Sequence, residues 1–169
     1  MYRYKKTVII KASTLAIPPQ MSDHMAVQDM AGHLIRRLHQ QSTAIFAERT
    51  QAAGFDLTPV QFAALEAIRV YPGIDQSGVA EQIGYDRATI GGVIDRLLKK
   101  AWINRTTNAK DRRSRELSLT PQGRRVLATL TPLVHDLQSA ILHPLSQADQ
   151  SVLLQLMYRV VWADKTSET

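Results

Sequence analysis

The sequence predicts a mainly α-helical fold that contains one β-hairpin. Three observations predict it. Long stretches place apolar residues at helical spacing behind recognisable helix starts, and two short helical segments are separated only by Gly84-Tyr85. A pair of β-prone runs then flanks a polar, basic turn. The predicted order is two helices, a helix pair with a tight turn, a hairpin and two more helices.

The first predicted helix covers residues 26–53, which contain no proline and repeat apolar residues at helical spacing before Gly54. Residues 1–24 precede it, with basic residues but no cleavage pattern typical of a secretory signal. No apolar run approaches the roughly 20 residues that span a bilayer. We therefore expect 1–24 to be a flexible N-terminal extension of a cytoplasmic protein that has no membrane partner.

The second predicted helix begins at Thr58-Pro59. The threonine hydroxyl can cap the helix, proline is tolerated in the first turn, and Gln61 completes a capping box. Tyr71-Pro72-Gly73 ends the helix.

Two short helical segments follow and form a helix-turn-helix over residues 75–99. Asp75 caps the first and Gly84 closes it, and Asp86 caps the second. The apolar stripe of the second helix has spacing i, i+3, i+4, i+7, i+8, and it consists of Ile90, Val93, Ile94, Leu97 and Leu98.

The hairpin is predicted over residues 103–119. Trp102–Thr106 is β-prone, and Arg115–Leu119 alternates polar and apolar residues as a half-buried strand does. A helix then begins at Thr120-Pro121 and continues to about His143, with a bend or local break predicted at Pro132. Ser146 resembles the start of a capping box for a last amphipathic helix.

A helix-turn-helix followed at once by a basic hairpin forms a winged helix-turn-helix, an α+β arrangement predicted here over residues 57–120. The flanking helical segments, 26–54 and 121–163, carry apolar stripes longer than one small domain can cover. We predict that they form a dimerisation region in a homodimer. The alternative is an intramolecular helical cap.

The basic residues are concentrated in one region. The chain has 21 Lys and Arg against 15 Asp and Glu, a net charge of +6. Residues 99–115 contain seven basic residues and one acidic residue, so this segment alone carries a charge of +6. The net charge of all other residues together is therefore zero. A basic cluster on a neutral body predicts a polyanion partner, first of all double-stranded DNA. A solvated basic loop is the alternative.

The second helix of the pair is predicted to enter the major groove, where base edges can be distinguished. Its solvent face and the wing supply the candidate DNA-binding residues, namely Ser77, Arg87, Ala88, Thr89, Arg96, Lys99, Arg105, Lys110, Asp111, Arg112, Arg113 and Arg115. Thr89 can offer a hydroxyl to phosphate or a methyl group to thymine. Gly91-Gly92 suggests close approach of either DNA or a neighbouring helix to the backbone.

The sequence resembles the multiple-antibiotic-resistance regulator (MarR) family of bacterial transcription factors. The resemblance covers about residues 26–163 and is carried by three segments, namely Leu57–Phe62, Asp86–Leu97 and Asp111–Gly123. It implies a homodimeric regulator, usually a repressor, that binds a palindromic operator. It also implies that Asp111 and Arg113 pair within the wing and that Arg112 or Arg115 enters the minor groove.

One position departs from the family pattern, because Ala101-Trp102 stands where the family often has glycine after the recognition helix. Alanine in a left-handed cap costs on the order of 1 kcal/mol, so we expect this helix to end in a different way.

Members of the family commonly respond to small aromatic acids, and a carboxylate ligand needs cationic groups beside apolar walls. The first helix offers His33, Arg37 and His39, and Phe46 and Phe62 can supply the walls. On an ideal helix Arg36 points away from this face. The resemblance to regulators of aromatic or heteroaromatic acid catabolism suggests such an effector. Ordinary surface His and Arg residues are the alternative.

Nothing in the sequence predicts an enzyme. There are no cysteines, and no two of the five histidines (24, 33, 39, 135 and 143) have the helical spacing typical of metal ligands. We predict no catalytic residues, no metal and no cofactor. The alternative to a ligand-responsive regulator is a winged-helix binding module without small-molecule control, including one that contacts protein or RNA.

Overall fold

The computed structural model describes residues 25–107 and 115–162. The chain divides into two compact units, Met1–Arg37 and Leu38–Thr169. Three predicted features lie outside the described residues: the N-terminal extension 1–24, the turn 108–114, and residue 163 at the end of the predicted dimerisation region.

The first unit contains a 3-10 turn, η1 (Ala26–Asp29), and the beginning of α1 (Ala31–Ala52), which continues into the second unit. The prediction of one helix from residue 26 is wrong at its start, because Met30 is extended, with ψ 134°. Apolar side chains are exposed in this unit at Val27, Met30, Leu34 and Ile35.

In the second unit, the two helices predicted over residues 75–99 form as α3 (Gln76–Ile83) and α4 (Arg87–Lys99), and the predicted helix before them forms as α2 (Pro59–Val70). The capping box of α2 is present, since Gln61 N donates to Thr58 Oγ1 and Thr58 N donates to Gln61 Oε1. Asp75 caps α3, and Gly84 ends it at φ +69°. These local signals place the turn directly before α4.

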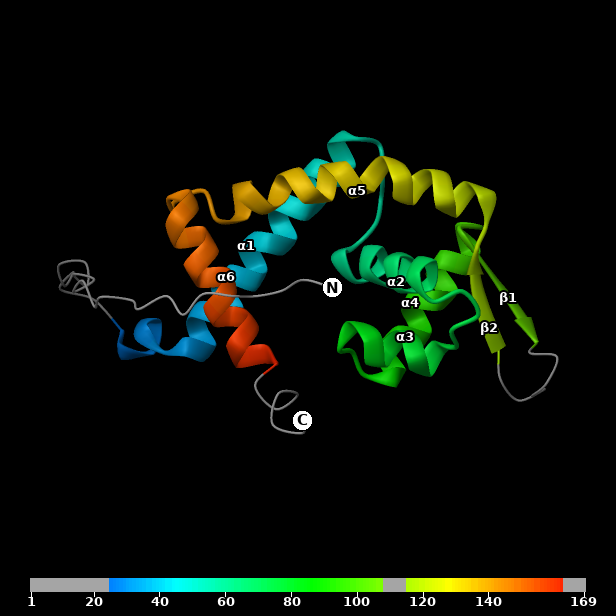
Figure 1. Ribbon diagram of the computed structural model, residues 1–169, viewed down its shortest axis with the longest axis horizontal. Helices are drawn as coiled ribbons and strands as arrows, with labels where there is room; N and C mark the ends of the chain where they lie inside the picture. The colour runs from blue at the N-terminus through cyan, green and yellow to red at the C-terminus, as the bar shows by residue number, and fades with distance from the viewer. Residues whose placement is uncertain (1–24, 108–114, 163–169) are drawn as a thin grey trace, which may run out of the picture. The chain divides into compact units, whose positions relative to one another are not determined.

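The hairpin pairs β1 (Ile103–Thr107) with β2 (Arg115–Leu119) in antiparallel register, with Ile103 opposite Leu119. A further pairing was not predicted. Gly73 N donates to Leu117 O at 3.1 Å, and Leu117 N donates to Ile74 O at 2.9 Å. The loop between α2 and α3 is therefore joined to the middle of β2 by two backbone hydrogen bonds (Figure 1).

The end of α4 corrects one prediction. Ala101 takes the left-handed conformation, with φ +55°, which a glycine usually takes after the end of a helix. The expectation that the helix ends in a different way is therefore wrong. Ala101 N donates to Leu98 O and Trp102 N donates to Leu97 O, the two bonds of a Schellman motif. Thr120 Oγ1 also donates to Ala101 O at 2.8 Å. These contacts hold an alanine in a conformation that costs about 1 kcal/mol.

The last two helices are α5 (Pro121–Ile141) and α6 (Gln147–Val161). The local break predicted at Pro132 is not found, because α5 continues through it. Ser146 caps α6 but does not form a full capping box, since its hydroxyl donates to the carboxylate of Asp149.

The core of the second unit lies between α2, α3, α4, the hairpin and the first half of α5. Its largest fully buried apolar side chains are Leu65, Ile68, Val79, Ile90, Ile94, Leu97, Ile103, Leu117, Leu127 and Leu130. The helix-turn-helix and the hairpin thus share one apolar interior, which fixes the exposed face of α4 relative to β1 and β2 (Figure 1). By contrast, α6 has no buried residue.

Candidate DNA-binding site

The exposed face of α4 carries most of the predicted DNA-binding residues. Ile90, Val93, Ile94 and Leu97 are buried as predicted, so the opposite side of the helix faces solvent. Exposed on it are Arg87, Ala88, Thr89, Arg96 and Lys99. Across the described ranges 25–107 and 115–162, no carboxylate forms an ion pair with the three basic residues. Their charge is available to a polyanion.

Asp86 and Thr89 form a local pair at the start of α4. Thr89 N donates to Asp86 Oδ1 at 2.8 Å, and Thr89 Oγ1 donates to Asp86 Oδ2 at 2.5 Å. The bond from the Thr89 hydroxyl, followed by the bond from its backbone N–H, lowers the pKa of Asp86 below its ordinary value. Asp86 is therefore an ionised cap, and the proton of the Thr89 hydroxyl is already donated to it.

The two glycines of α4 have different surroundings, which separates the alternatives left open by the sequence. A Cβ on Gly91 would lie 3.3 Å from Gln76 Nε2 of α3, so this glycine meets a neighbouring helix. A Cβ on Gly92 would meet nothing nearer than Arg96 Nη2 at 3.9 Å. Gly92 is exposed and leaves the middle of the helix face without a side chain.

An ion pair joins the hairpin to the recognition helix. Arg105 Nη2 of β1 lies 3.0 Å from Asp95 Oδ1 of α4. Arg105 was predicted to contact DNA, and the structure gives it this intramolecular partner. Arg115, also a predicted contact, is exposed and donates from Nη1 to Thr107 Oγ1 across the hairpin. Both arginines therefore hold defined positions relative to α4 or β1.

Ser77 lies in the first turn of α3 and is half-buried. Asp75 caps the same turn by accepting from Gly78 N at 2.7 Å. Gln76 Nε2 reaches Arg87 O at 3.4 Å, so the beginnings of α3 and α4 are adjacent. Of the remaining candidates, the wing residues Lys110, Asp111, Arg112 and Arg113 lie outside the described residues.

Lys100 is a residue whose role the sequence did not predict. Its Nζ donates to the backbone carbonyl of Asp56, lies 3.2 Å from Asp56 Oδ2, and lies 5.0 Å from the centre of the Trp102 ring. Lys100 therefore links the end of α4 to the segment between α1 and α2. Local sequence carries no signal for this contact, because the two residues are 44 positions apart.

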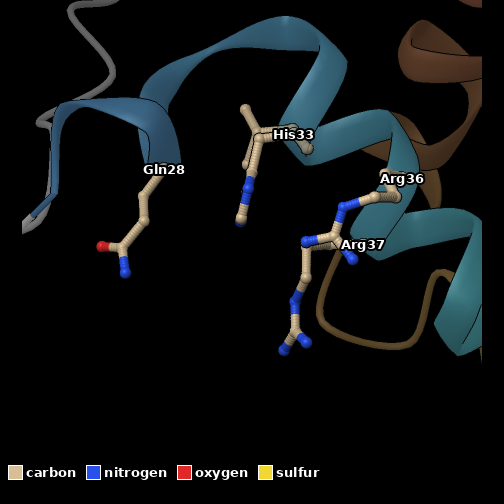
Figure 2. Close-up of a pocket in the computed structure, with 5 residues that line it drawn as sticks. Gln28, His33, Arg36 and Arg37 are labelled. Atoms are coloured by element: carbon tan, nitrogen blue, oxygen red, sulfur yellow. The ribbon is translucent and has the colours of Figure 1, made fainter.

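The predicted effector residues fall into two groups. In the first unit, His33 and Arg37 line an open hollow of about 460 Å³ together with Gln28, Leu34 and Arg36. Figure 2 shows Gln28, His33 and Arg37 extending toward the same side. Arg36, which was expected to point away from the apolar face of the helix, also lines the hollow, and Gln28 was missed because η1 was not predicted. These N–H donors are chemically suited to an anion.

The second group consists of the two phenylalanines. Phe46 and Phe62 lie with ring centroids 6.2 Å apart and an interplanar angle of 60°, a favourable tilted pair. Phe46 is only 4% exposed and belongs to the core of the second unit, whereas Phe62 is half-buried. His39 is exposed on α1 and does not line the hollow.

In residues 25–107 and 115–162, no three His, Cys, Asp or Glu side chains gather as they would around a metal ion. No helix there combines the length and apolar character needed to cross a membrane.

The comparisons with known proteins agree with this geometry. The sequence model of the MarR family matches residues 57–114. The transcriptional regulator HosA of Escherichia coli O127:H6 is 33% identical over 137 residues, which are 81% of this chain and 98% of HosA. The transcriptional repressor NicR of Pseudomonas putida KT2440 is 27% identical over 93% of this chain and 98% of NicR.

A solved structure is similar in fold as well as in sequence. It concerns Bordetella bronchiseptica BpsR and the regulation of its DNA binding by 6-hydroxynicotinic acid. The TM-score is 0.74 with 27% identity, over 82% of this chain and 97% of BpsR.

Proposed function

Because the chain belongs to the MarR family of transcriptional regulators, we propose that it is a homodimeric repressor that binds a palindromic operator. In this proposal the repressor dissociates from the operator when a small aromatic or heteroaromatic acid binds to it. Its relatives are DNA-binding regulators and not enzymes. The observation that carries the proposal is the exposed face of α4, where Arg87, Arg96 and Lys99 have no acidic partner among the described residues. Such a protein acts on the chromosome, in the cytoplasm.

In this proposal α4 lies in the major groove, and β1 and β2 flank the adjacent minor groove. Arg87 and Arg96 contact guanine edges or phosphates, and Lys99 contacts phosphate. The Arg105–Asp95 ion pair sets the hairpin relative to α4, so both elements meet DNA in a fixed geometry. By resemblance to the family, Asp111 is proposed to pair with Arg113 within the wing, Arg112 or Arg115 to enter the minor groove, and Lys110 to contribute to DNA binding.

A second copy of the chain is proposed to cover the exposed apolar residues of α6. None of its residues is buried, and Tyr158, Val160 and Val161 are 65%, 78% and 67% exposed. Apolar patches of this kind mark interfaces, and dimers of two-fold symmetry match palindromic operators. Val27, Met30, Leu34 and Ile35 of the first unit present a similar apolar surface, and we assign them to the same dimerisation region.

Sedimentation equilibrium tests the dimer. Val160→Glu places a charge on the exposed apolar face of α6 and should shift the protein toward monomer. Gln155→Glu adds the same charge on the same helix at a polar position and should not. A wild-type chain that sediments as a monomer at micromolar concentration would contradict the proposal.

The effector is proposed to bind with its carboxylate at His33 and Arg37, which line the same hollow. The regulation of BpsR DNA binding by 6-hydroxynicotinic acid supports a heteroaromatic acid as the first candidate. The other predicted contributors, His39, Phe46 and Phe62, belong to the second unit, where Phe46 and Phe62 pack together.

The DNA-binding test uses the full chain and the DNA upstream of its own gene. We expect footprinting to reveal one protected palindrome, and 6-hydroxynicotinic acid or 4-hydroxybenzoic acid to release it. The corresponding neutral amides serve as controls. If the operator is protected but no acid releases the protein, the chain is a regulator without small-molecule control. If no DNA is protected, the repressor assignment is contradicted.

A thermal-shift assay tests the effector residues. Wild-type protein should gain thermal stability with the acid, because a ligand that binds only the folded state stabilises it. Arg37→Gln should lose most of this gain, whereas Arg49→Gln, on the last turn of the same helix, should keep it. Equal gains in both variants would remove Arg37 from the site.

A further inference from the structure

Apart from Arg87 at its first position, the outer face of the first two turns of α4 has few groups that can hydrogen-bond to DNA. We propose that this face reads the C5-methyl groups of thymines, and that Thr89 contributes its methyl group and not its hydroxyl. The inference rests on the proposed function, since it assumes that α4 enters the major groove. It adds to the proposed function which bases α4 contacts and which chemical group recognises them.

The hydroxyl of Thr89 has only one proton, and that proton is used within the protein. Thr89 Oγ1 donates to Asp86 Oδ2 at 2.5 Å, while Thr89 N donates to Asp86 Oδ1 at 2.8 Å. Phosphate oxygens only accept hydrogen bonds, so a hydroxyl whose proton is committed cannot bind them. The hydroxyl oxygen can still accept from a base amino group, but towards phosphate oxygens and the acceptor atoms of bases the group that Thr89 has left is its methyl group.

The neighbours of Thr89 extend this apolar surface. Ala88 and Gly92 lie one turn apart on the same face of the helix, and both are exposed. A Cβ on Gly92 would meet no atom closer than 3.9 Å, so the backbone itself is open to a close partner. Thymine is the base that presents a methyl group in the major groove, and apolar side chains contact it there.

The positions of the charged residues on α4 are consistent with separate groups for affinity and for the choice of base. The carboxylate of Asp86 and the guanidinium of Arg87 stand side by side in sequence at the beginning of the helix, so their charges offset each other there. Arg96 and Lys99, about three turns further along, supply the attraction to the DNA backbone. Affinity then depends mainly on the basic residues, and the choice of thymine depends on the methyl surface.

The test begins with an operator selected by the full chain from a random library of DNA duplexes. Each thymine of the recovered duplex is then replaced by deoxyuridine, which removes the methyl group and keeps the base pair. We expect at least one thymine per half-site at which this change weakens binding about fourfold, the loss for one buried methyl group. Recovery of no duplex contradicts the proposed function, whereas a duplex indifferent to uracil overturns this inference alone.

Two variants of Thr89 with side chains of similar size show whether its methyl group or its hydroxyl group contacts the thymine. Thr89→Val keeps the methyl group and removes the hydroxyl, while Thr89→Ser does the reverse. The readout is the ratio of affinities for the thymine and uracil duplexes at the sensitive position. The ratio should persist in Thr89→Val and fall toward one in Thr89→Ser. A ratio that persists in Thr89→Ser, or disappears in Thr89→Val, overturns the assignment.

Discussion

Gly123 of α5 packs its backbone against the carbonyl of Trp102, so closely that a Cβ on Gly123 would lie 1.9 Å from the Trp102 oxygen. The same oxygen accepts from Thr120 N at 3.0 Å, and Thr120 Oγ1 caps α5 by accepting from Gly123 N at 2.9 Å. One backbone contact thus joins the end of the hairpin and the start of α5 to the segment that follows the recognition helix.

Gly123→Ala should therefore destabilise the fold severely. The obstacle is backbone and not a flexible side chain, so α5 or the hairpin must shift, and we expect a loss of about 3 kcal/mol or more. Urea unfolding measures it. Gly32→Ala is the matched control, because a Cβ there meets nothing within 4 Å. Equal stability of the two variants would show that the contact is looser than described.

Ala101→Gly should stabilise the protein by about 0.5–1 kcal/mol. Alanine pays a steric cost at φ +55° that glycine does not, and this gain exceeds the added freedom of glycine in the unfolded chain. Thermal unfolding tests this. A lower melting temperature would mean that packing at Ala101 outweighs the backbone strain.

Gly92→Ala should raise the stability of the protein and lower its affinity for the operator. Alanine favours a helix over glycine by about 1 kcal/mol, and the position has open space, so the melting temperature should rise. Operator affinity should fall, because the new methyl group stands where DNA approaches the backbone. The two measurements are thermal unfolding and fluorescence anisotropy with a labelled operator. Unchanged affinity would show that DNA does not come close at this point.

Arg96→Gln and Lys99→Gln should each lower the salt dependence of operator binding. Each contact to a phosphate adds about 0.9 to the slope of log affinity against log salt, so each variant should lose about one unit. Arg69→Gln removes the same charge from α2, where Arg69 is paired with Glu66 at 2.6 Å, and serves as the control. A slope that falls equally in all three variants would reflect net charge and not contact.

The cap of α4 should depend on pH through Asp86. Its pKa in the folded protein is below the ordinary 3.8, chiefly because of the Thr89 hydroxyl, so the ionised form favours the folded state. This contribution is fully present above the ordinary pKa and is lost as pH falls through the lower folded value. Thr89→Val should raise the pKa of Asp86 toward 3.8, as carboxyl NMR titration can measure. Identical titration in both proteins would contradict the hydroxyl's role.

The parts of the fold that the sequence predicted correctly depend on neighbours three or four residues apart. Thr58, Asp75, Asp86 and Thr120 each cap the helix that follows them, and each cap is closed by a backbone N–H three positions later. Such signals need no knowledge of the rest of the chain. The helix-turn-helix follows from them directly, and the hairpin follows from the β-prone run and the alternation of Arg115–Leu119, which are also local patterns.

The missed features join residues that are distant in sequence. Leu117 pairs with Gly73 and Ile74, and Lys100 reaches Asp56, although no local pattern marks these positions as partners. The conformation of Ala101 was predicted wrongly for a related reason. The Schellman bonds and the hydroxyl of Thr120 together outweigh a local cost of about 1 kcal/mol. The same limit applies to Gln28, whose place in the hollow depends on η1.

The chain contains two tryptophans, and they stand in contrasting surroundings. Trp102, 8% exposed under the ammonium group of Lys100, lies beside the joint between α4 and the hairpin, whereas Trp162, 38% exposed, follows α6. Indole emission shifts to longer wavelength with contact to water, so each ring provides an intrinsic optical signal for its own region. Proteins that retain a single tryptophan would therefore report movement of the DNA-reading part and association through α6 separately, without any added label.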